Sequence, residues 1–504
     1  MRSNADCLLG IDIGTSGLKC VLVNRAGRVL EHAVRDYTPA APQPGWAEQD
    51  PEVWVDAAVS AVREVVERTG VDRASIAGIG FSGQMHSTVC LDKDRRCVRP
   101  AILWLDRRSI RQVNTLRETL GSSQIAQWIG NPIVPGFMLS SLLWLKETEP
   151  TSWDRLAHVL LPKDYVRFRL IGELGTDYSD ASSTGLLDVQ HRRWSTELAQ
   201  AAGIAIEILP PRFESATIVG HLAPDMAEAM NLTSGVPVVC GAGDQESQAI
   251  GNGLIRPGII SCTIGTGGQL FASIDKYQID PQLRLHTFCH AVPNLWHWEA
   301  ATLTAGLSLR WLRDEVLAGR YTYRELADAA ATIEPDAEGL IYLPYLEGER
   351  TPHMDPLARG VFCGLTLRHT WKHLARAVME GVVFSLLDGL ELMRSMGLSV
   401  ERIVASGGGT RHPLWLQLQA DILGAEVVTS EAEEAAALGA ALLAGIGVGM
   451  YSDFDTACDA AVRLSREVYR PRPAIAAQYL KIAEVYRSLY RSLAPVFKNL
   501  ASQA

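Results

Sequence analysis

The sequence lacks the signatures of several protein classes. Its nine cysteines include no Cys-x-x-Cys pair, and its net charge of −10 comes without a long basic run or an arginine stripe. Scattered single thiols are typical of buried, reduced cysteines in a cytoplasmic protein. The missing basic surface argues against nucleic acid and acidic membranes as partners, whereas an anionic small molecule fits if its site supplies local donors.

Long apolar runs are missing too. No clean apolar run precedes Asp12, so we expect no secretory leader. The uncharged stretch Ala435–Tyr451 has 17 residues, mostly alanine and glycine, and is too short and too weakly apolar for a bilayer span. It predicts instead a close-packed internal helix that ends in a glycine-rich turn.

Two familiar nucleotide-binding motifs do not account for the glycines. The chain has no Walker loop, and the glycine stretches at 241–246 and 407–409 do not follow the Rossmann spacing. What is present is an ordinary globular composition, 47% apolar and 21% charged, over 504 residues. That length is too great for one hydrophobic core, so we expect two large domains or several small ones.

A charged residue interrupts the first apolar strand, in "IDIGTSGLKC". Asp12 lies inside an otherwise buried run, and Gly14 and Gly17 flank Thr15 and Ser16. Burying a carboxylate is costly unless a charge or hydrogen-bond donors compensate, and a turn with exposed N–H groups can close on an anion. The alternative is a plain β-hairpin with Asp12 on a solvated face.

The same pattern returns in the second half of the chain. Ile13–Gly17 reads Ile-Gly-Thr-Ser-Gly, and Ile264–Gly268 reads Ile-Gly-Thr-Gly-Gly, each between two β-rich segments. The placement predicts two related α/β domains, 1–253 and 254–504, that each present one hairpin loop to a shared catalytic cleft. Two facing loops of backbone donors suit the two ends of a polyphosphate.

Two further positions stand at strand-to-helix junctions. Gly407–Gly409 follow an apolar strand, where glycines let the backbone lie flat against a ligand or simply allow tight packing. Asp244 follows a strand and precedes a helix, so it fits an N-cap. Phosphoryl transfer to an alcohol needs a proton acceptor and Mg²⁺ on the phosphates, and Asp244 and Asp12 fit these two tasks.

The chain resembles the FGGY family of carbohydrate kinases, and within it the bacterial xylulokinases. The similarity runs over nearly the whole length. It is carried by "GIDIGTSGLK", "IGTGGQ", "ASGGGTRHPLW", "SGQMH", "LPYLEGERTPHMDP" and the segment 360–380. It implies two ribonuclease-H-like, actin-like ATPase domains with the catalytic cleft between them, and an ATP-dependent kinase that converts D-xylulose to D-xylulose 5-phosphate.

The resemblance also implies roles for individual residues. Asp244 is expected to be the general base, and Asp12 to support Mg²⁺, through water. The nucleotide phosphates and adenosine are expected at Gly14, Thr15, Ser16, Gly265, Thr266, Gly267, Gly408 and Gly409. The sugar is expected at Met85, His86, Trp104, Asp244 and Gln245. A homodimer is common among such proteins, and the sequence itself does not show one.

Four residues depart from the xylulokinase pattern: Leu105, Ser141, Gln245 and Ser87. None lies in a phosphate loop, so these departures do not affect the prediction of phosphoryl transfer. They leave the identity of the sugar undecided. D-ribulose, another pentulose, erythritol or glycerol are the rival substrates. An actin- or chaperone-like ATPase is a remote alternative, disfavoured because the chain after Gly409 holds a helical end and no appended binding domain. A catalytically dead regulator is disfavoured because both carboxylates and both loops are intact.

Overall fold

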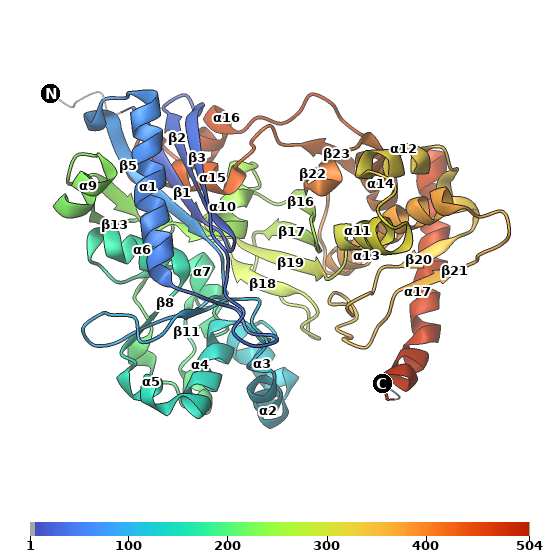
Figure 1. Ribbon diagram of the computed structural model, residues 1–504, viewed down its shortest axis with the longest axis horizontal. Helices are drawn as coiled ribbons and strands as arrows, with labels where there is room; N and C mark the ends of the chain where they lie inside the picture. The colour runs from blue at the N-terminus through green and yellow to red at the C-terminus, as the bar shows by residue number, and fades with distance from the viewer. Residues whose placement is uncertain (1–5, 503–504) are drawn as a thin grey trace.

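The structure is a computed structural model that describes residues 6–502. Two mixed β-sheets lie side by side, one built by the start of the chain and one by the residues after 258 (Figure 1). The fold class expected from the sequence is confirmed, because both halves repeat one α/β plan.

The first sheet begins with an antiparallel meander. Its strands follow the order β13-β14-β5-β1-β2-β3, and the short β15 also pairs with β5. β1 runs antiparallel to β2 and parallel to β5. The strands are β1 (Cys7–Ile13), β2 (Gly17–Asn24), β3 (Val29–Asp36), β5 (Ile76–Gly83), β13 (Ile218–His221), β14 (Pro237–Val239) and β15 (Ala242–Gly243).

The second sheet has the order β18-β19-β17-β16-β22-β23. Here β16 runs antiparallel to β17 and parallel to β22, so β16, β17 and β22 correspond to β1, β2 and β5. The strands are β16 (Ile259–Ile264), β17 (Gly268–Ile274), β18 (His286–Cys289), β19 (Trp296–Thr302), β22 (Arg402–Gly407) and β23 (Glu426–Thr429). Each predicted glycine turn therefore joins the first two strands of its sheet.

A long helix precedes the strand that runs parallel to the first strand of each sheet. In the first sheet it is α1 (Pro51–Thr69), an amphipathic helix with Val55, Val62 and Val66 buried. Its counterpart is α13 (Trp371–Ser395), which is buried along most of its length. Other helices of the second half are α11 (Gly306–Trp311), α12 (Tyr323–Ala331), α14 (Pro413–Leu423), α16 (Phe454–Ala461) and α17 (Pro473–Ala501), and α15 is described below.

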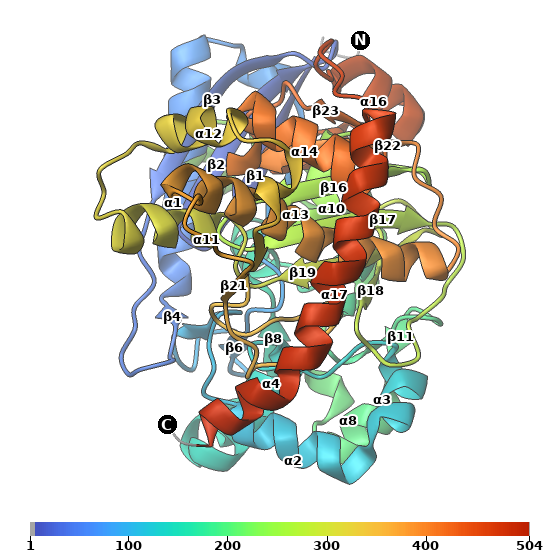
Figure 2. The ribbon, with the colours of Figure 1, turned by 90° about the vertical axis from the view of Figure 1, so that its right-hand side faces the viewer.

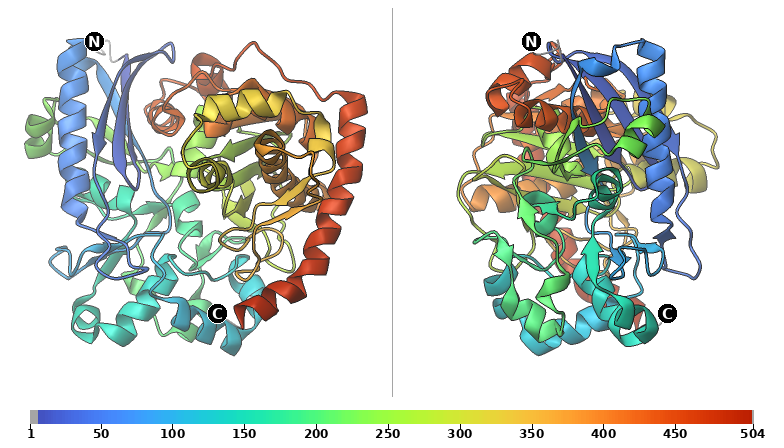
Figure 3. Two further views of the ribbon diagram at one scale, coloured as in Figure 1. Left: turned by 45° about the vertical axis from the view of Figure 1, so that its right-hand side comes forward. Right: turned by 90° about the vertical axis from the view of Figure 1, so that its left-hand side faces the viewer.

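A helical region is inserted into the first half and lies below the first sheet in Figure 1. Its helices are α2 (Ile110–Leu120), α3 (Ser122–Ile129), α4 (Met138–Thr148), α5 (Pro150–Arg155), α6 (Pro162–Ile171), α7 (Tyr178–Ser182) and α8 (Thr196–Ala202). α9 (Pro224–Met230) follows it. On the opposite side, α17 runs along the outer edge of the second half (Figures 2 and 3).

Short two-stranded pairs complete the connections. They are formed by β4 (Glu48–Gln49) with β7 (Ala101–Ile102), β6 (Val89–Leu91) with β8 (His158–Leu160), β9 (Thr176–Asp177) with β12 (Arg212–Phe213), β10 (Leu187–Asp188) with β11 (Arg193–Trp194), and β20 (Ile341–Leu343) with β21 (Val361–Cys363). All nine cysteines are free thiols. Across residues 6–502, no helix is both long and apolar enough to cross a bilayer.

One helix of the second half packs directly on the first sheet. α15 (Ala435–Gly447) is the predicted alanine- and glycine-rich internal helix, and its segment 437–445 is buried. A Cβ added at Gly10 would lie 1.9 Å from the Ala437 carbonyl oxygen, and one at Gly80 would lie 1.8 Å from that of Ala440. Only glycine on β1 and β5 lets the helix backbone approach this closely, so the halves meet through backbone contact.

Candidate active site

The first glycine turn is held closed from three sides. Within the turn, the Gly14 amide donates to the Gly17 carbonyl at 2.9 Å. The Gly14 carbonyl accepts the Tyr37 hydroxyl at 2.8 Å and the Gln84 side-chain amide at 3.2 Å. The Thr15 hydroxyl donates to Gln84 Oε1 and accepts the Trp104 indole N–H at 2.8 Å. Ser16 is left exposed at the tip.

Asp12 lies at the buried end of this hairpin. It is 7% exposed, and the Ser82 hydroxyl of the neighbouring strand β5 donates to its Oδ1 at 2.7 Å. Burial raises the pKa of Asp12, while Ser82 and the Lys19 ammonium lower it. Lys19 itself forms an ion pair with Glu434 at 2.6 Å. The hydrogen bond and the nearby charge offset the cost of burial only in part, and the pKa of Asp12 stays above its ordinary value.

Asp244 follows β15, on the far side of β5 from Asp12. Ser82 pairs with Asp12 on one side and with Ala242 on the other, so β1 and β15 are separated by two strand spacings, or about 10 Å. Asp244 is the first residue of α10 (Asp244–Gly251), and Gly243 takes the N-cap position. The N-cap expectation for Asp244 is thus wrong by one residue, because the extended β15 backbone continues through Gly243.

The electrostatic surroundings of Asp244 raise its affinity for a proton. Desolvation, together with the neighbouring carboxylates of Asp12, Glu246 and Asp180, raises the pKa of Asp244 well above its ordinary value. The side chain is half-buried. A carboxylate surrounded by like charges binds a proton more strongly than an aspartate in water does, which is the property a proton acceptor needs.

A large cavity lies in the second half. Its volume is about 860 Å³, and four predicted nucleotide residues, Gly265, Thr266, Gly408 and Gly409, line it. Its other walls include Arg310, Tyr323, Arg324, Asp328, His412 and Trp415. Gly14, Thr15, Ser16 and Gly267 are not among the lining residues, so the two glycine turns do not share this cavity.

The second turn is held by the start of α11. The Gly306 amide donates to the Gly265 carbonyl at 2.8 Å, and the Ala305 amide donates to the Thr266 carbonyl at 2.9 Å. A Cβ at Gly306 would lie 2.4 Å from the Gly265 carbonyl oxygen. The strand-to-helix junction at 407–409 lies against the same turn, since Gly407 pairs with Ile264 across the sheet.

His86 is fixed by the inserted helical region. Its ring stacks on Phe137 with a centroid separation of 3.9 Å, and its Nδ1 lies 2.7 Å from the Ser183 carbonyl oxygen. Burial lowers the pKa of His86 to about 4, so the ring is neutral at physiological pH. Because a carbonyl only accepts, Nδ1 carries the proton and Nε2 is left as an acceptor.

The other predicted sugar residues fall in two groups. Met85 is buried with Phe137 and Phe288 beside His86, and Gln245 is half-buried next to Asp244. Trp104 is 40% exposed and bonds the first glycine turn through its indole. Trp104 therefore contacts both the first glycine turn and the loop that carries Met85 and His86, because its amide also donates to the Ser87 hydroxyl at 3.0 Å.

The residues that depart from the xylulokinase pattern lie around this region. Leu105 is 40% exposed, beside the buried Asp106 that bonds Arg108. Ser141 is buried on α4, one turn from Phe137, the ring on which His86 stacks. Ser87 donates to Gln84 Oε1 at 3.2 Å. Leu105 and Ser87 thus adjoin predicted sugar residues in the chain, Gln245 is itself one, and Ser141 lies one helical turn from Phe137.

Several polar residues near the site were not predicted. Gln84, directly after β5, joins the Gly14 carbonyl to the Thr15 hydroxyl. Glu246 on α10 contacts His297 on β19 at 2.8 Å, and both side chains are fully buried, so this pair connects the two halves. No local pattern marks either contact, because the partners are far apart in sequence.

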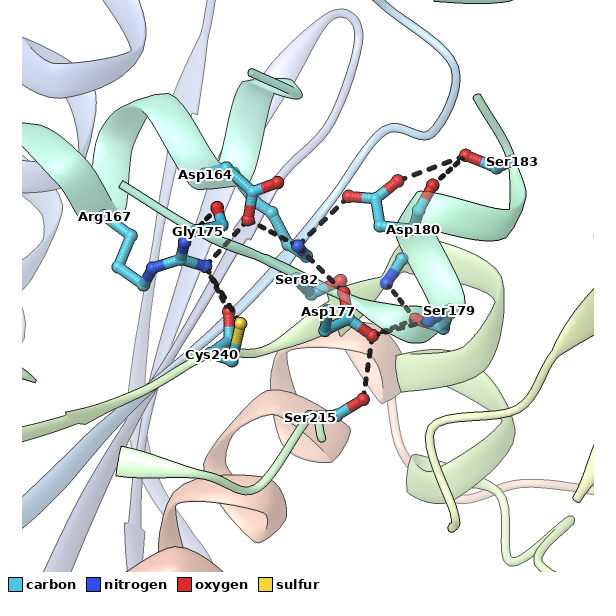
Figure 4. A network of polar contacts seen from close by, with 12 residues as sticks. Ser82, Asp164, Arg167, Gly175, Asp177, Ser179, Asp180, Ser183, Ser215 and Cys240 are labelled. Atoms are coloured by element: carbon cyan, nitrogen blue, oxygen red, sulfur yellow. Dashed lines mark hydrogen bonds and ion pairs between the residues drawn. The ribbon is translucent and has the colours of Figure 1, made fainter. Parts of the chain in front are cut away.

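A buried ionic cluster underlies the site (Figure 4). We call it the Lys163 cluster, and its members are Lys163, Asp164, Arg167, Asp177 and Asp180. All five side chains have no exposed surface. The segment "LLPKDYVRFRL" hints at it, since charged residues stand at 163, 164 and 167 inside an apolar run.

The residues present fit a magnesium ion only in part. Within residues 6–502, no three His, Cys, Asp or Glu side chains gather into a metal-binding group. Mg²⁺ is commonly held by one or two carboxylates together with water and substrate phosphates. Asp12, next to the first glycine turn and bonded by protein only through Ser82, supplies one such carboxylate.

Comparisons with known proteins agree with this architecture. Family models for the FGGY family of carbohydrate kinases match residues 7–251 with the N-terminal domain and 260–448 with the C-terminal domain. The xylulose kinase of Bacillus subtilis is 38% identical over 483 residues, covering 96% of both chains. The gluconokinase of the same species is 33% identical over 98% of this chain and 95% of its own.

A solved structure shows the same fold. The crystal structure of xylulose kinase from Rhodospirillum rubrum is 31% identical and superposes with a TM-score of 0.92, over 98% of this chain and all of the other.

Proposed function

Because the chain belongs to the FGGY family of carbohydrate kinases and is a sugar phosphotransferase, we propose that it phosphorylates D-xylulose to D-xylulose 5-phosphate with ATP. The observation that carries the proposal is the position of Asp244. It stands at the start of α10, two strands from Asp12 and among like charges that raise its pKa. The kinase membership also sets aside the actin- and chaperone-like alternative.

In the proposed reaction, Asp244 accepts the proton of the sugar hydroxyl as that oxygen attacks the γ-phosphorus of ATP. The P–O bond to ADP breaks as the new bond forms. The sugar lies between Asp244 and His86, and the neutral His86 accepts a hydroxyl hydrogen bond at Nε2. Met85, Trp104 and Gln245 complete this surface.

The nucleotide occupies the 860 Å³ cavity in this proposal. Gly408 and Gly409 border adenosine, and Gly265, Thr266 and Gly267 contact phosphate. Gly14, Thr15 and Ser16 reach the transferred phosphoryl group from the other half, so closing the halves would complete the site and exclude water. Mg²⁺, when bound, neutralises phosphate charge, and Asp12 would hold it through water.

The sugar itself has rivals. The alternative substrates are D-ribulose, erythritol, glycerol and gluconate. Gluconate is included because the gluconokinase relative aligns with nearly the whole chain. One observation favours a neutral sugar over gluconate, because the carboxylates around Asp244 would repel a carboxylate substrate. The division into domains 1–253 and 254–504, a cytoplasmic location and a homodimer belong to the same proposal as predictions.

The proposal is tested by a coupled ADP-release assay with Mg²⁺ and each sugar in turn: D-xylulose, D-ribulose, L-ribulose, L-xylulose, D-gluconate, glycerol and erythritol. We expect the highest kcat/KM with D-xylulose. A higher value with any other sugar replaces the substrate, and turnover with none above the no-sugar background contradicts the proposal.

A further inference from the structure

We propose that Lys163 is a positioning residue for both walls of the sugar site, an inference that rests on the proposed function. Its ammonium is the shared partner of Asp177 and Asp180. Each of these aspartates contacts one serine, Asp177 with Ser179 and Asp180 with Ser183 (Figure 4). Each serine in turn bonds a backbone amide at the edge of the proposed site. One branch ends at the amide that precedes the proposed base, and the other ends at His86.

The first branch leads to Asp244. Lys163 Nζ lies 3.0 Å from Asp177 Oδ1, and Asp177 Oδ2 accepts the Ser179 hydroxyl at 2.6 Å. The Ser179 oxygen in turn accepts the Gly243 amide at 3.0 Å. Gly243 is the N-cap of α10, so this bond sets where the helix and its first residue, Asp244, begin.

The second branch leads to His86. Lys163 Nζ lies 3.2 Å from Asp180 Oδ2, and the Ser183 hydroxyl donates to the Asp180 carbonyl at 2.7 Å and lies 3.3 Å from Asp180 Oδ1. The Ser183 oxygen accepts the His86 amide at 3.3 Å, and the Ser183 carbonyl accepts from His86 Nδ1 at 2.7 Å. This branch therefore fixes both the backbone and the ring of His86, which has a positive φ of 71°.

The rest of the cluster supports the same loop. Arg167 contacts Asp164 at 2.7 Å and donates to the Cys240 carbonyl at 2.6 Å, on the segment that leads to Gly243. Lys163 also packs against β5, the strand that lies between Asp12 and Asp244. A Cβ added at Gly83 on β5 would lie 2.9 Å from Lys163 Cβ. The cluster thus contacts β5, the segment before α10, and α7.

Charge balance fits a positioning role. Two cations face three carboxylates with no solvent access, and burial together with Asp164 and Asp177 raises the pKa of Asp180 well above its ordinary value. The like charges of Asp164 and Asp177 beside Asp180 are offset in part by its contact with Lys163. Buried ion clusters add little net stability compared with apolar packing, so stability alone is a weak reason for five such residues here. Fixed geometry at the reacting atoms is a stronger one.

The two branches predict effects on different kinetic parameters: a lower kcat for the first and a higher sugar KM for the second. A merely structural role would not separate the two parameters. Ser179→Ala releases the Gly243 amide and misplaces the base, so kcat falls by about 10- to 100-fold while the sugar KM stays within about threefold. Ser183→Ala removes the oxygen that accepts the His86 amide and contacts Asp180, while the Ser183 carbonyl still holds the ring. The backbone at His86 is then less fixed, so the sugar KM rises by about tenfold while kcat stays within about threefold. Lys163→Met shows both effects, and the ATP KM changes in none of the three.

Ser195→Ala is the matched control, because Ser195 is an equally buried serine that caps α8 through the Leu198 amide. It should lose similar stability and keep wild-type kcat and KM. The inference is overturned if both site-serine variants behave like this control, or if both lower kcat and raise KM alike. Should Lys163→Met fail to fold, the serine pair still decides.

A readout without turnover separates this inference from the proposed function. In ¹⁵N-histidine spectra, with His86 assigned by a His86→Gln variant, the wild type should show the Nδ1-protonated form. Ser183→Ala should shift this signal, and Ser179→Ala and Ser195→Ala should leave it unchanged. If the wild type phosphorylates no sugar in the panel, the proposed function fails, and an unchanged His86 signal in Ser183→Ala would independently contradict the coupling.

Discussion

Replacing Asp244 by asparagine should lower activity and raise stability at once. Asparagine has the same shape but cannot accept the proton of the sugar hydroxyl. General-base catalysis contributes about 10²- to 10⁴-fold, which corresponds to about 2.7–5.4 kcal/mol of barrier. Because Asp244 does not line the nucleotide cavity, ATP affinity measured by calorimetry should be unchanged while kcat falls within that range.

The stability gain follows from the raised pKa. The folded state holds Asp244 at a higher pKa than the unfolded chain does, so ionising it at neutral pH disfavours folding. This penalty is absent below the pKa of the aspartate in the unfolded chain, about 3.9, and complete above its pKa in the folded protein. It amounts to about 1.4 kcal/mol for each unit of difference between the two pKa values. Asparagine removes this penalty. It also loses the stabilisation of about 0.3–1 kcal/mol that a negative charge gives a helix N-terminus.

The assay is urea unfolding of both proteins at pH 8 and near pH 4. We expect Asp244→Asn to have the larger free energy of unfolding at pH 8, and the difference to shrink as the pH falls. Near-normal turnover of the variant would refute Asp244 as the base. A variant that is less stable at pH 8 would refute the electrostatic account of its surroundings.

Four other predictions can be checked with the same preparations. The kcat/KM of the wild type should fall on acidification with a midpoint above 3.9, because the raised pKa of Asp244 leaves the base protonated there; a flat profile down to pH 4 would contradict this. Gly306→Ala should raise the ATP KM by tenfold or more, since its Cβ would lie 2.4 Å from the Gly265 carbonyl oxygen, and an unchanged ATP KM would show that the second turn does not hold phosphate. Trp104→Phe should lower kcat by about five- to tenfold, corresponding to a hydrogen bond of about 1 kcal/mol to Thr15, while Trp153→Phe on the distant α5 should not. Chelation by EDTA should abolish turnover and added Mg²⁺ should restore it; activity that survives chelation would remove the metal role from Asp12.

The fold was accessible from the sequence because its signals are local and repeated. Each glycine turn lies between two β-rich segments, and the structure makes both turns the first hairpin of a sheet. The run 435–447 was recognisable as a buried helix from its alanines and glycines. That it packs on the first sheet was not, because the fit depends on Gly10 and Gly80, which lie hundreds of residues away.

The supporting parts of the site were less accessible for the same reason. Gln84 bonds Gly14 and Thr15 across 70 and 69 residues, and Glu246 meets His297 across 51. A single sequence contains no sign of such pairs, since each partner reads as an ordinary polar residue of its own element. The N-cap prediction for Asp244 was wrong by one residue, because a strand end and an N-cap share the same residue preferences.

The measurement that tests the central claim most directly is a competition. The protein is incubated with limiting ATP, Mg²⁺ and equal concentrations of D-xylulose, D-ribulose, D-gluconate and glycerol, and the phosphorylated products are separated and quantified by mass spectrometry. Because competing substrates partition by kcat/KM, the account predicts that D-xylulose 5-phosphate predominates. A predominance of phosphogluconate or glycerol phosphate, or no phosphorylated product, would contradict it.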